Sequence, residues 1–243
     1  MSPRPYRGGQ RQAAAEQTRA KILDAARELL TAASGPGALS MEAAARKAGV
    51  ARMTVYYQFE SKTGLLEALF DDLAQRGGMS GMPKVFTLAT GSQALRGLIR
   101  TLVHFYASDR LALRRLRGLA MVDPELEAAL IARGERRRGG LGVILGRLVS
   151  ERASGDTEGV VADLVGPLFM LTSFETYDAL ADSDGDPAPV VLRIEELAGL
   201  LLDRRLPTGV SDWPDVPAGR TEPTAPTGTT PAEPSGPAGP GES

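Results

Sequence analysis

Between residues 51 and 58 the sequence ARMTVYYQ gathers side chains that can bond to nucleic acid. Arginine can donate two hydrogen bonds to guanine and glutamine can bond adenine, while threonine and tyrosine hydroxyls reach bases or phosphate oxygens. On a helix, Val55 and Phe59 turn inward together and leave these groups on or near the outer face. Taken singly, a tyrosine here is more often a packing aromatic and an arginine a solvated charge. The whole set predicts a DNA-contacting face.

A helix-turn-helix should position this face. Ser40 is a suitable N-cap for a helix that begins at about Met41, in a run rich in alanine. Ala45, Gly49 and Val55 then follow at offsets of four and ten residues. At those offsets a helix-turn-helix needs a small residue at the helix crossing, a residue that tolerates φ > 0 in the turn, and an apolar residue facing the core.

A third helix should begin directly after the second, with Ser61 as its N-cap and Lys62 in its first turn. The free N–H groups of a helix N-terminus, together with a cation, offer a site for phosphate. Apolar residues mark the buried side of this helix as far as about Gln75: Leu65, Leu66, Leu69, Phe70 and Leu73. We therefore expect it to link the DNA-contacting part to whatever packs on its far end.

The stretch GVARMTVYYQFESKTGLLEALF resembles the signature of TetR-family transcriptional regulators, with a Gly-Val turn, a Thr-apolar-Tyr-Tyr-x-Phe recognition helix and a Ser-Lys pair opening the next helix. The resemblance is strong over roughly residues 18–70 and extends to about Leu206 only in architecture. It implies two groups of contacts: base edges by Arg52, Met53, Thr54 and Tyr56, and phosphates by Ser40, Tyr57, Gln58 and Lys62.

Some positions depart from the family pattern. Gln58 stands where histidine is usual, which keeps a hydrogen-bonding group but removes any dependence on protonation. Thr63-Gly64 replaces an acidic residue and alanine, so we expect a looser helix start. Glu42 lies where some relatives reach DNA with a basic residue. It can accept a bond from a cytosine amino group or be simply solvated, and we favour solvation.

The composition limits which fold classes and which kinds of site the chain can have. A chain of 243 residues with 42% apolar content can bury a core and suggests one or two domains. Without cysteine it has no disulfide framework, thiolate metal site or cysteine nucleophile. No secretory leader is recognisable, and no apolar run approaches the about 20 residues of a membrane helix. We expect no membrane association and a cytoplasmic protein, associated with the bacterial nucleoid when bound to DNA.

Charge is unevenly distributed along the chain. Residues 1–62 hold ten basic and five acidic residues, residues 63–206 seventeen and twenty, and residues 207–243 one and five. Only the first segment is basic, as expected if it alone meets phosphates. Within it, residues 1–17 are predicted to be a flexible basic arm. Its Arg4, Arg7 and Arg11 can follow the DNA backbone, enter the minor groove or remain solvated.

The periodicity predicts an all-α fold with two functional parts. A helix-turn-helix DNA-binding domain is expected over residues 18–62 and a linking helix over 63–76. A glycine-rich break then leads into a helical ligand-binding and dimerisation domain over 77–206. Residues 207–243, rich in Pro, Gly and Thr and acidic, should form a disordered tail.

The last two predicted helices suggest a homodimer. Gly166-Pro167-Leu168-Phe169 lies inside the penultimate one and is similar to a string in a TetR subgroup whose last two helices pair across a twofold axis. The final helix, from Val190 to Leu202, is apolar and has no other obvious cover. Paired recognition helices then predict a palindromic operator.

A ligand pocket is expected between helices of the second part, for a small apolar or amphipathic effector. Aromatic and adaptable groups from two separate helices suggest its lining: His104, Phe105, Phe169, Met170, Phe174 and Tyr177. Ordinary cores have the same mixture, so plain packing is the competing interpretation for each residue. Arg136-Arg137-Arg138 is interpreted as a solvated helix face rather than a second nucleic-acid patch.

These features predict a sequence-specific DNA-binding regulator, most simply a homodimeric repressor released by a ligand. The sequence shows no Walker or dinucleotide motif, no clustered metal ligands and no carboxylate pair, so we expect neither a cofactor nor catalysis. Two alternatives stay open. One is a DNA-binding or architectural protein that takes no ligand, and the other is an enzyme built on a helical bundle.

Overall fold

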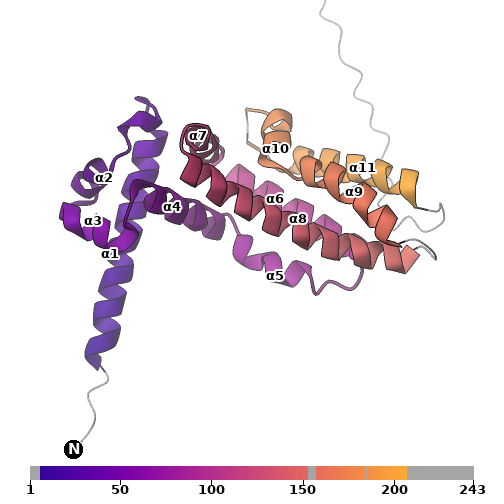
Figure 1. Ribbon diagram of the computed structural model, residues 1–243, viewed down its shortest axis with the longest axis horizontal. Helices are drawn as coiled ribbons and strands as arrows, with labels where there is room; N and C mark the ends of the chain where they lie inside the picture. The colour runs from indigo at the N-terminus through magenta and orange to yellow at the C-terminus, as the bar shows by residue number, and fades with distance from the viewer. Residues whose placement is uncertain (1–5, 153–156, 184, 207–243) are drawn as a thin grey trace, which may run out of the picture. The chain divides into compact units, whose positions relative to one another are not determined.

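The computed structural model describes residues 6–152, 157–183 and 185–206, with side chains from Gly9 onward. Within these ranges every regular element is helical, which confirms the predicted all-α fold (Figure 1). The α-helices are α1 (Tyr6–Thr31), α2 (Met41–Ala48), α3 (Arg52–Phe59), α4 (Lys62–Arg76), α5 (Met82–Val85), α6 (Gly91–Ser108), α7 (Arg110–Ala120), α8 (Pro124–Arg152), α9 (Thr157–Leu171), α10 (Phe174–Leu180) and α11 (Ala188–Arg205). Two 3₁₀ turns are η1 (Pro36–Ala38) and η2 (Met79–Gly81).

Helices α2 and α3 form the predicted helix-turn-helix. The Ser40 hydroxyl accepts a hydrogen bond from the Ala43 N–H at 3.1 Å and caps α2. Gly49 ends that helix in the left-handed region, at φ 68° and ψ 34°, as the turn requires. Val55 is fully buried and Phe59 nearly so, which fixes the inward side of α3. The local sequence signals for this motif are confirmed.

The first helix is longer than its predicted start at Thr18. It begins at Tyr6, so residues 6–17, which were expected to be a flexible arm, are helical. The run QRQAAAEQ has high helix propensity, and Gln12 donates to Glu16 one turn later at 3.2 Å. The glycines that suggested flexibility lie close to the helix start, where they cost little.

The described residues belong to one compact unit. Within it, α4 packs against α1 and α3 and also against α6, α7 and α8. Its four buried leucines join both sets of helices into one continuous apolar core: Leu65, Leu66, Leu69 and Leu73. The division of function at residues 62 and 77 therefore stays a prediction, while the packing is continuous.

The remaining helices form a bundle in which α8 contacts α6, α7 and α9, and α11 packs on α6 and α9 (Figure 1). Pro167 lies inside α9, as expected. A separate α10 was not predicted: the chain breaks after Leu171 and begins this helix, which is capped by the Ser173 hydroxyl. The predicted tail, residues 207–243, lies outside the described residues.

The junction of α3 and α4 is tightly closed. Glu60, between the two helices, adopts φ 63° and donates its N–H to the Tyr56 carbonyl at 2.8 Å. Ser61 caps α4 by accepting from the Gly64 N–H at 3.0 Å. A Cβ at Gly64 would lie 2.2 Å from the Phe59 carbonyl oxygen. Gly64 is therefore needed for close approach rather than being a source of looseness, which corrects the sequence-based expectation.

Gly64→Ala should lower the free energy of unfolding by about 1–3 kcal/mol, because the new methyl group forces the two helices apart. The control is Gly118→Ala in α7, where a Cβ would meet no atom within 4 Å. That change should stabilise by about 0.5–1 kcal/mol, as alanine does in an open helix position. Denaturant unfolding of both variants checks the pair. Equal stability of Gly64→Ala and the parent chain would contradict the close-approach interpretation.

Candidate nucleic-acid interface and ligand pocket

The outer face of α3 presents apolar and aromatic groups to solvent. The side chain of Tyr57 is 89% exposed and that of Met53 is 72% exposed. A packing role within the chain, the competing interpretation for Tyr57, does not apply to a side chain so open. Thr54 and Tyr56 are partly buried beside them. The helix therefore offers a surface that nothing in the described chain covers.

Arg52 is held in place by neighbours on two helices. Its Nη2 lies 2.8 Å from the Glu42 carboxylate and 3.2 Å from the Tyr56 hydroxyl, and its guanidinium stands 5.1 Å from the centre of the Tyr56 ring. The Tyr56 hydroxyl in turn donates to Glu42 at 3.4 Å. Glu42 is thus not simply solvated, as the sequence suggested. It is a partner of the arginine expected to read bases.

The charge on Glu42 is secure at neutral pH. A hydrogen bond from its own backbone N–H, in the first turn of α2, lowers the pKa of the Glu42 carboxyl, and the Arg52 charge lowers it further. Because a lowered carboxyl pKa keeps the ionised form, the pair with Arg52 persists from neutral pH down through the mildly acidic range.

The residues expected to contact phosphate lie at helix ends and on α3. Lys62 is exposed at the start of α4, and no carboxylate in the described chain is within ion-pair distance of it. Ser40 and the neighbour of Lys62, Ser61, each cap a helix, so their hydroxyl protons remain available. Gln58 is half-buried, and its backbone carbonyl accepts a hydrogen bond from Arg19 at 3.3 Å. This arrangement suits anions at two helix N-termini.

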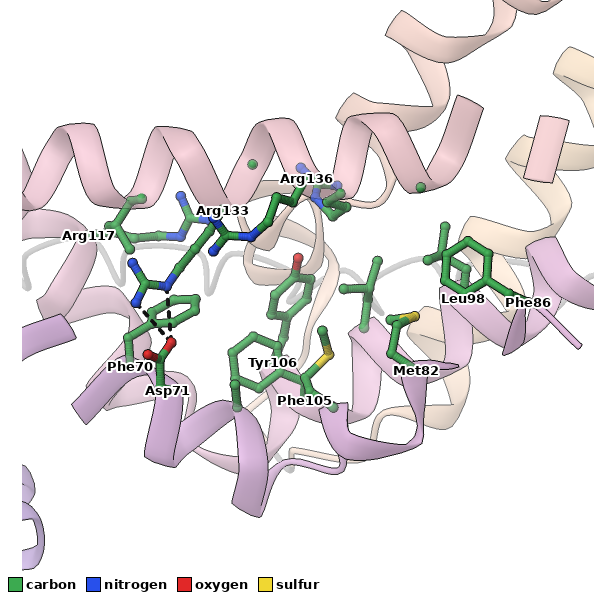
Figure 2. A pocket seen from close by; sticks show the side chains of 17 residues that line it. Phe70, Asp71, Met82, Phe86, Leu98, Phe105, Tyr106, Arg117, Arg133 and Arg136 are labelled. Carbon is green, nitrogen blue, oxygen red and sulfur yellow. Dashed lines mark hydrogen bonds and ion pairs between the residues drawn. The ribbon is translucent and has the colours of Figure 1, made fainter. Parts of the chain in front are cut away.

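A cavity of about 360 Å³ lies beside α4, between it and α5, α6 and α8 (Figure 2). Aromatic, aliphatic and thioether groups make most of its wall: Phe70, Ala74, Met79, Met82, Phe86, Leu98, Leu102, Phe105, Tyr106 and Leu130. Its polar groups are Asp71 of α4, Arg117 of α7, and Arg133, Arg136 and Arg137 of α8. A size and lining of this kind are typical of small-molecule sites.

Only one of the six predicted pocket residues, Phe105, lines this cavity. Phe169 and Phe174 line a second hollow of about 660 Å³ on the other side of Arg137. Tyr177 is 1% exposed and packs in the core, with its ring 5.8 Å from that of Tyr106. For Tyr177 the competing interpretation, plain packing, is the one that the structure supports.

His104 and Met170 do not reach either hollow. His104 is exposed, and its Nδ1 lies 2.8 Å from the Arg100 carbonyl one turn earlier. It directly precedes Phe105, so the helix turns it about 100° away from the cavity. Met170 is 62% exposed on α9. Both assignments to the pocket are corrected.

The arginines of α8 were the residues that the sequence analysis missed. Arg136 and Arg137 were interpreted as a solvated face, yet both line the cavity. A signal was present, because Arg133 and Arg137 continue the apolar stripe of Leu126 and Leu130 at offsets of seven and eleven residues. Charged residues on the buried stripe of a helix indicate a site rather than a surface.

Carboxylates already neutralise two arginines of the cavity. Arg133, over the Phe70 ring, pairs with Glu67 at 3.2 Å and with Asp71 at 2.9 Å, both on α4. Arg117 pairs with Glu175 at 2.6 Å. The two ion pairs of Arg133 connect α8 to α4 directly at the cavity wall.

The described residues contain little that points to a metal site or to a membrane-spanning segment. No group of three or more histidine or acidic side chains there is placed to hold a metal ion. No single described helix has the length and apolar character to cross a membrane. The bent pair α9 and α10 has that length and apolar character only when the two helices are taken together.

Comparison with known proteins begins with the family model described as bacterial regulatory proteins, tetR family, which matches residues 22–69. A search of curated proteins finds no match to the sequence. Among solved structures, a TetR transcription regulator from Haloarcula marismortui is 19% identical with a TM-score of 0.60, over 79% of this chain and 100% of that one. A putative TetR-family transcriptional regulator from Mesorhizobium loti is 19% identical with a TM-score of 0.57, over 77% and 96%.

A third similar structure was solved with a ligand. It is a putative transcriptional regulator from Saccharomonospora viridis in complex with choline, 12% identical with a TM-score of 0.56, over 79% of this chain and 98% of that one. At these identities the structures show the fold, while the family model covers α1 from Ile22 to the middle of α4. The chain therefore carries a helix-turn-helix domain of the tetR type over residues 22–69 and has the all-helical fold of TetR-family transcriptional regulators.

Proposed function

We propose that the protein is a homodimeric repressor that binds a palindromic operator through α3 and leaves it when a small molecule fills the cavity beside α4. The observation that carries the proposal is the uncovered face of α3, with Tyr57 and Met53 largely in solvent and Arg52 fixed beside them. Such a protein works in the cytoplasm, on the nucleoid.

The proposed division of DNA contacts follows the geometry of α3 and of the helix ends. Bases are read by Arg52, Met53, Thr54 and Tyr56, and phosphates are held by Ser40, Tyr57, Gln58 and Lys62. Arg52 can bond guanine through two donors, and the exposed Met53 can contact a thymine methyl. Lys62 adds a full charge to the N-terminus of α4, where phosphate is already favoured.

Helix α4 supports the coupling between ligand and DNA. Lys62 lies at its start, while Phe70 and Asp71, two turns further on, form part of the cavity wall. Arg133 of α8 fastens that wall by two ion pairs, to Asp71 and Glu67. A ligand that competes for Arg133 or displaces Phe70 favours a different position of α4. Operator affinity then falls by at most the ratio of the ligand's affinities for the two positions.

Exposed apolar side chains on the last helices support the proposed dimer. Leu192 and Leu200 on α11 are 64% and 62% exposed, and Met170 on α9 is equally open. Large apolar groups left in solvent are typical of interfaces. A twofold axis through these helices would pair the two copies of α3.

The cavity also bears on the two alternative functions, a DNA-binding protein without a ligand and an enzyme. A regulator or architectural protein without a ligand is favoured by a filled core, and about 360 Å³ of space beside α4 disfavours it. An enzyme on this scaffold would need acid and base groups converging in the cavity, where the lining carboxylate, Asp71, is paired with Arg133.

Selection of bound fragments from randomised DNA tests the proposal. The expected product is an inverted repeat with half-sites about one helical turn or more apart, bound by two chains. A contrary result would be that no sequence is enriched and that the affinity for DNA falls steeply as salt rises. The protein would then bind phosphates without reading bases, and the architectural alternative would be favoured.

On the selected operator, Lys62→Ala should weaken binding to specific and random DNA alike and reduce the slope of log affinity against log salt by about 1. Arg52→Ala should instead lose about 1–3 kcal/mol of discrimination at one base pair per half-site. Anisotropy titrations at several salt concentrations measure both. Lys84→Ala, an exposed lysine on α5, is the control and should change neither. The same loss of discrimination in both test variants would refute the division of roles.

Leu200→Glu should convert the dimer to a monomer, because two carboxylates would be buried across the twofold axis without partners. Leu111→Glu on α7, another exposed leucine at 44%, is the matched control and should leave the dimer intact. Light scattering after gel filtration gives the masses. A dimer that survives Leu192→Glu and Leu200→Glu together would place the interface elsewhere.

A further inference from the structure

The cavity beside α4 has an electrostatic preference that the proposed function does not specify. Resting on that function, we propose that the effector is an anionic amphiphile: a carboxylate, sulfonate or phosphate head held by Arg136 and Arg137, with an apolar chain among Met82, Phe86 and Leu98.

The first support is a surplus of positive charge at the cavity. Arg133 and Arg117 have carboxylate partners, whereas Arg136 and Arg137 have none within ion-pair distance in the described chain. The acids nearby are engaged elsewhere, with Glu175 on Arg117, Glu135 on Arg138, and Asp178 on Arg110 and Arg114. An incoming anion therefore meets two cations without having to displace a carboxylate.

The second support is the setting of Arg137. Its guanidinium lies 3.9 Å from the centre of the Phe169 ring and donates to the Phe169 carbonyl at 2.9 Å and the Thr172 hydroxyl at 2.7 Å. Each of these partners is neutral. Burial lowers the pKa of Arg137, but a guanidinium stays protonated in proteins, so the charge remains and is poorly solvated. An anion in the cavity would relieve that cost.

The third support is the separation of the cavity into two ends. Figure 2 shows Arg133 and Arg136 along α8 on one side, and Met82, Phe86 and Leu98 gathered away from the arginines. Tyr106 and Phe105 lie between the two ends. A ligand with charge at one end and hydrocarbon at the other matches both, whereas a uniformly apolar one would leave Arg137 without a counter-ion.

The same charges disfavour a cation of the choline type. Recognition of a quaternary ammonium needs aromatic faces free of competing cations. Here Arg133 occupies the Phe70 face at 5.2 Å, and Arg136 and Arg137 add two further cations to the lining of the same cavity. The resemblance in fold to a choline-binding structure therefore does not extend to its ligand.

The test uses three ligands that share a ten-carbon chain: decanoate, decan-1-ol and decyltrimethylammonium. Each is titrated calorimetrically into the full-length protein without DNA. Decanoate should bind at least about tenfold more tightly than the alcohol, and the ammonium should bind most weakly. In a series of shorter carboxylates affinity should fall about fourfold for each methylene removed.

Two variants locate the head group. Arg136→Gln should remove the preference for decanoate over decanol while leaving decanol affinity unchanged, and Arg137→Gln should do the same if its thermal unfolding stays cooperative. The matched control is Arg138→Gln, on the same helix and outside the cavity lining, which should keep the preference. Arg136 is exposed, so its variant does not depend on repacking the core.

The outcomes separate this proposal from the proposed function. Failure of decanoate to bind at about 1 mM, equal affinity for decanol, or retention of the preference in Arg136→Gln overturns the anionic ligand class. Operator release is measured separately. Decanoate that binds with the expected preference but leaves the protein on its operator supports the ligand class and contradicts ligand-relieved repression.

Discussion

The structure depends on one helix being part of two packed layers. Helix α4 buries Leu65, Leu66, Leu69 and Leu73 against helices on both of its sides. A helix held in this way cannot rotate to suit one set of neighbours without disturbing the other, because cores are packed at crystal-like density. Its first turn closes on α3 through Gly64, and its last two turns border the cavity. The proposed DNA contacts and the wall of the cavity thus lie on one and the same helix.

The ion pairs around α4 restrict it further. Arg76 joins it to Asp24 of α1 at 2.7 Å, and Arg133 joins it to α8 through Glu67 and Asp71. These pairs are partly exposed, so each contributes little stability. They define the position of α4 more than they add to the free energy of folding.

The sequence predicted what is local and missed what is tertiary. Ser40, Gly49 and Val55 act within a few residues of one another, so type and spacing were enough to predict the helix-turn-helix. The cavity forms where α4, α5, α6 and α8 meet, and no single stretch shows which aromatic side chains face it. Tyr177 and Phe105 are both buried core aromatics, yet of the two only Phe105 lines the cavity. Arg137 was misjudged because its neighbours in sequence are also charged, although its helical phase matched the apolar stripe.

If Arg52 reads a base as we propose, its contact with Glu42 affects how selectively it does so. The arginine is already ordered by a carboxylate and a tyrosine, so little side-chain entropy remains to be lost on meeting guanine. The carboxylate is also a competitor that is always present. A base that offers less than guanine leaves the guanidinium with its partner on the neighbouring helix. Selectivity then arises as much from the contact that must be loosened as from the one that is gained.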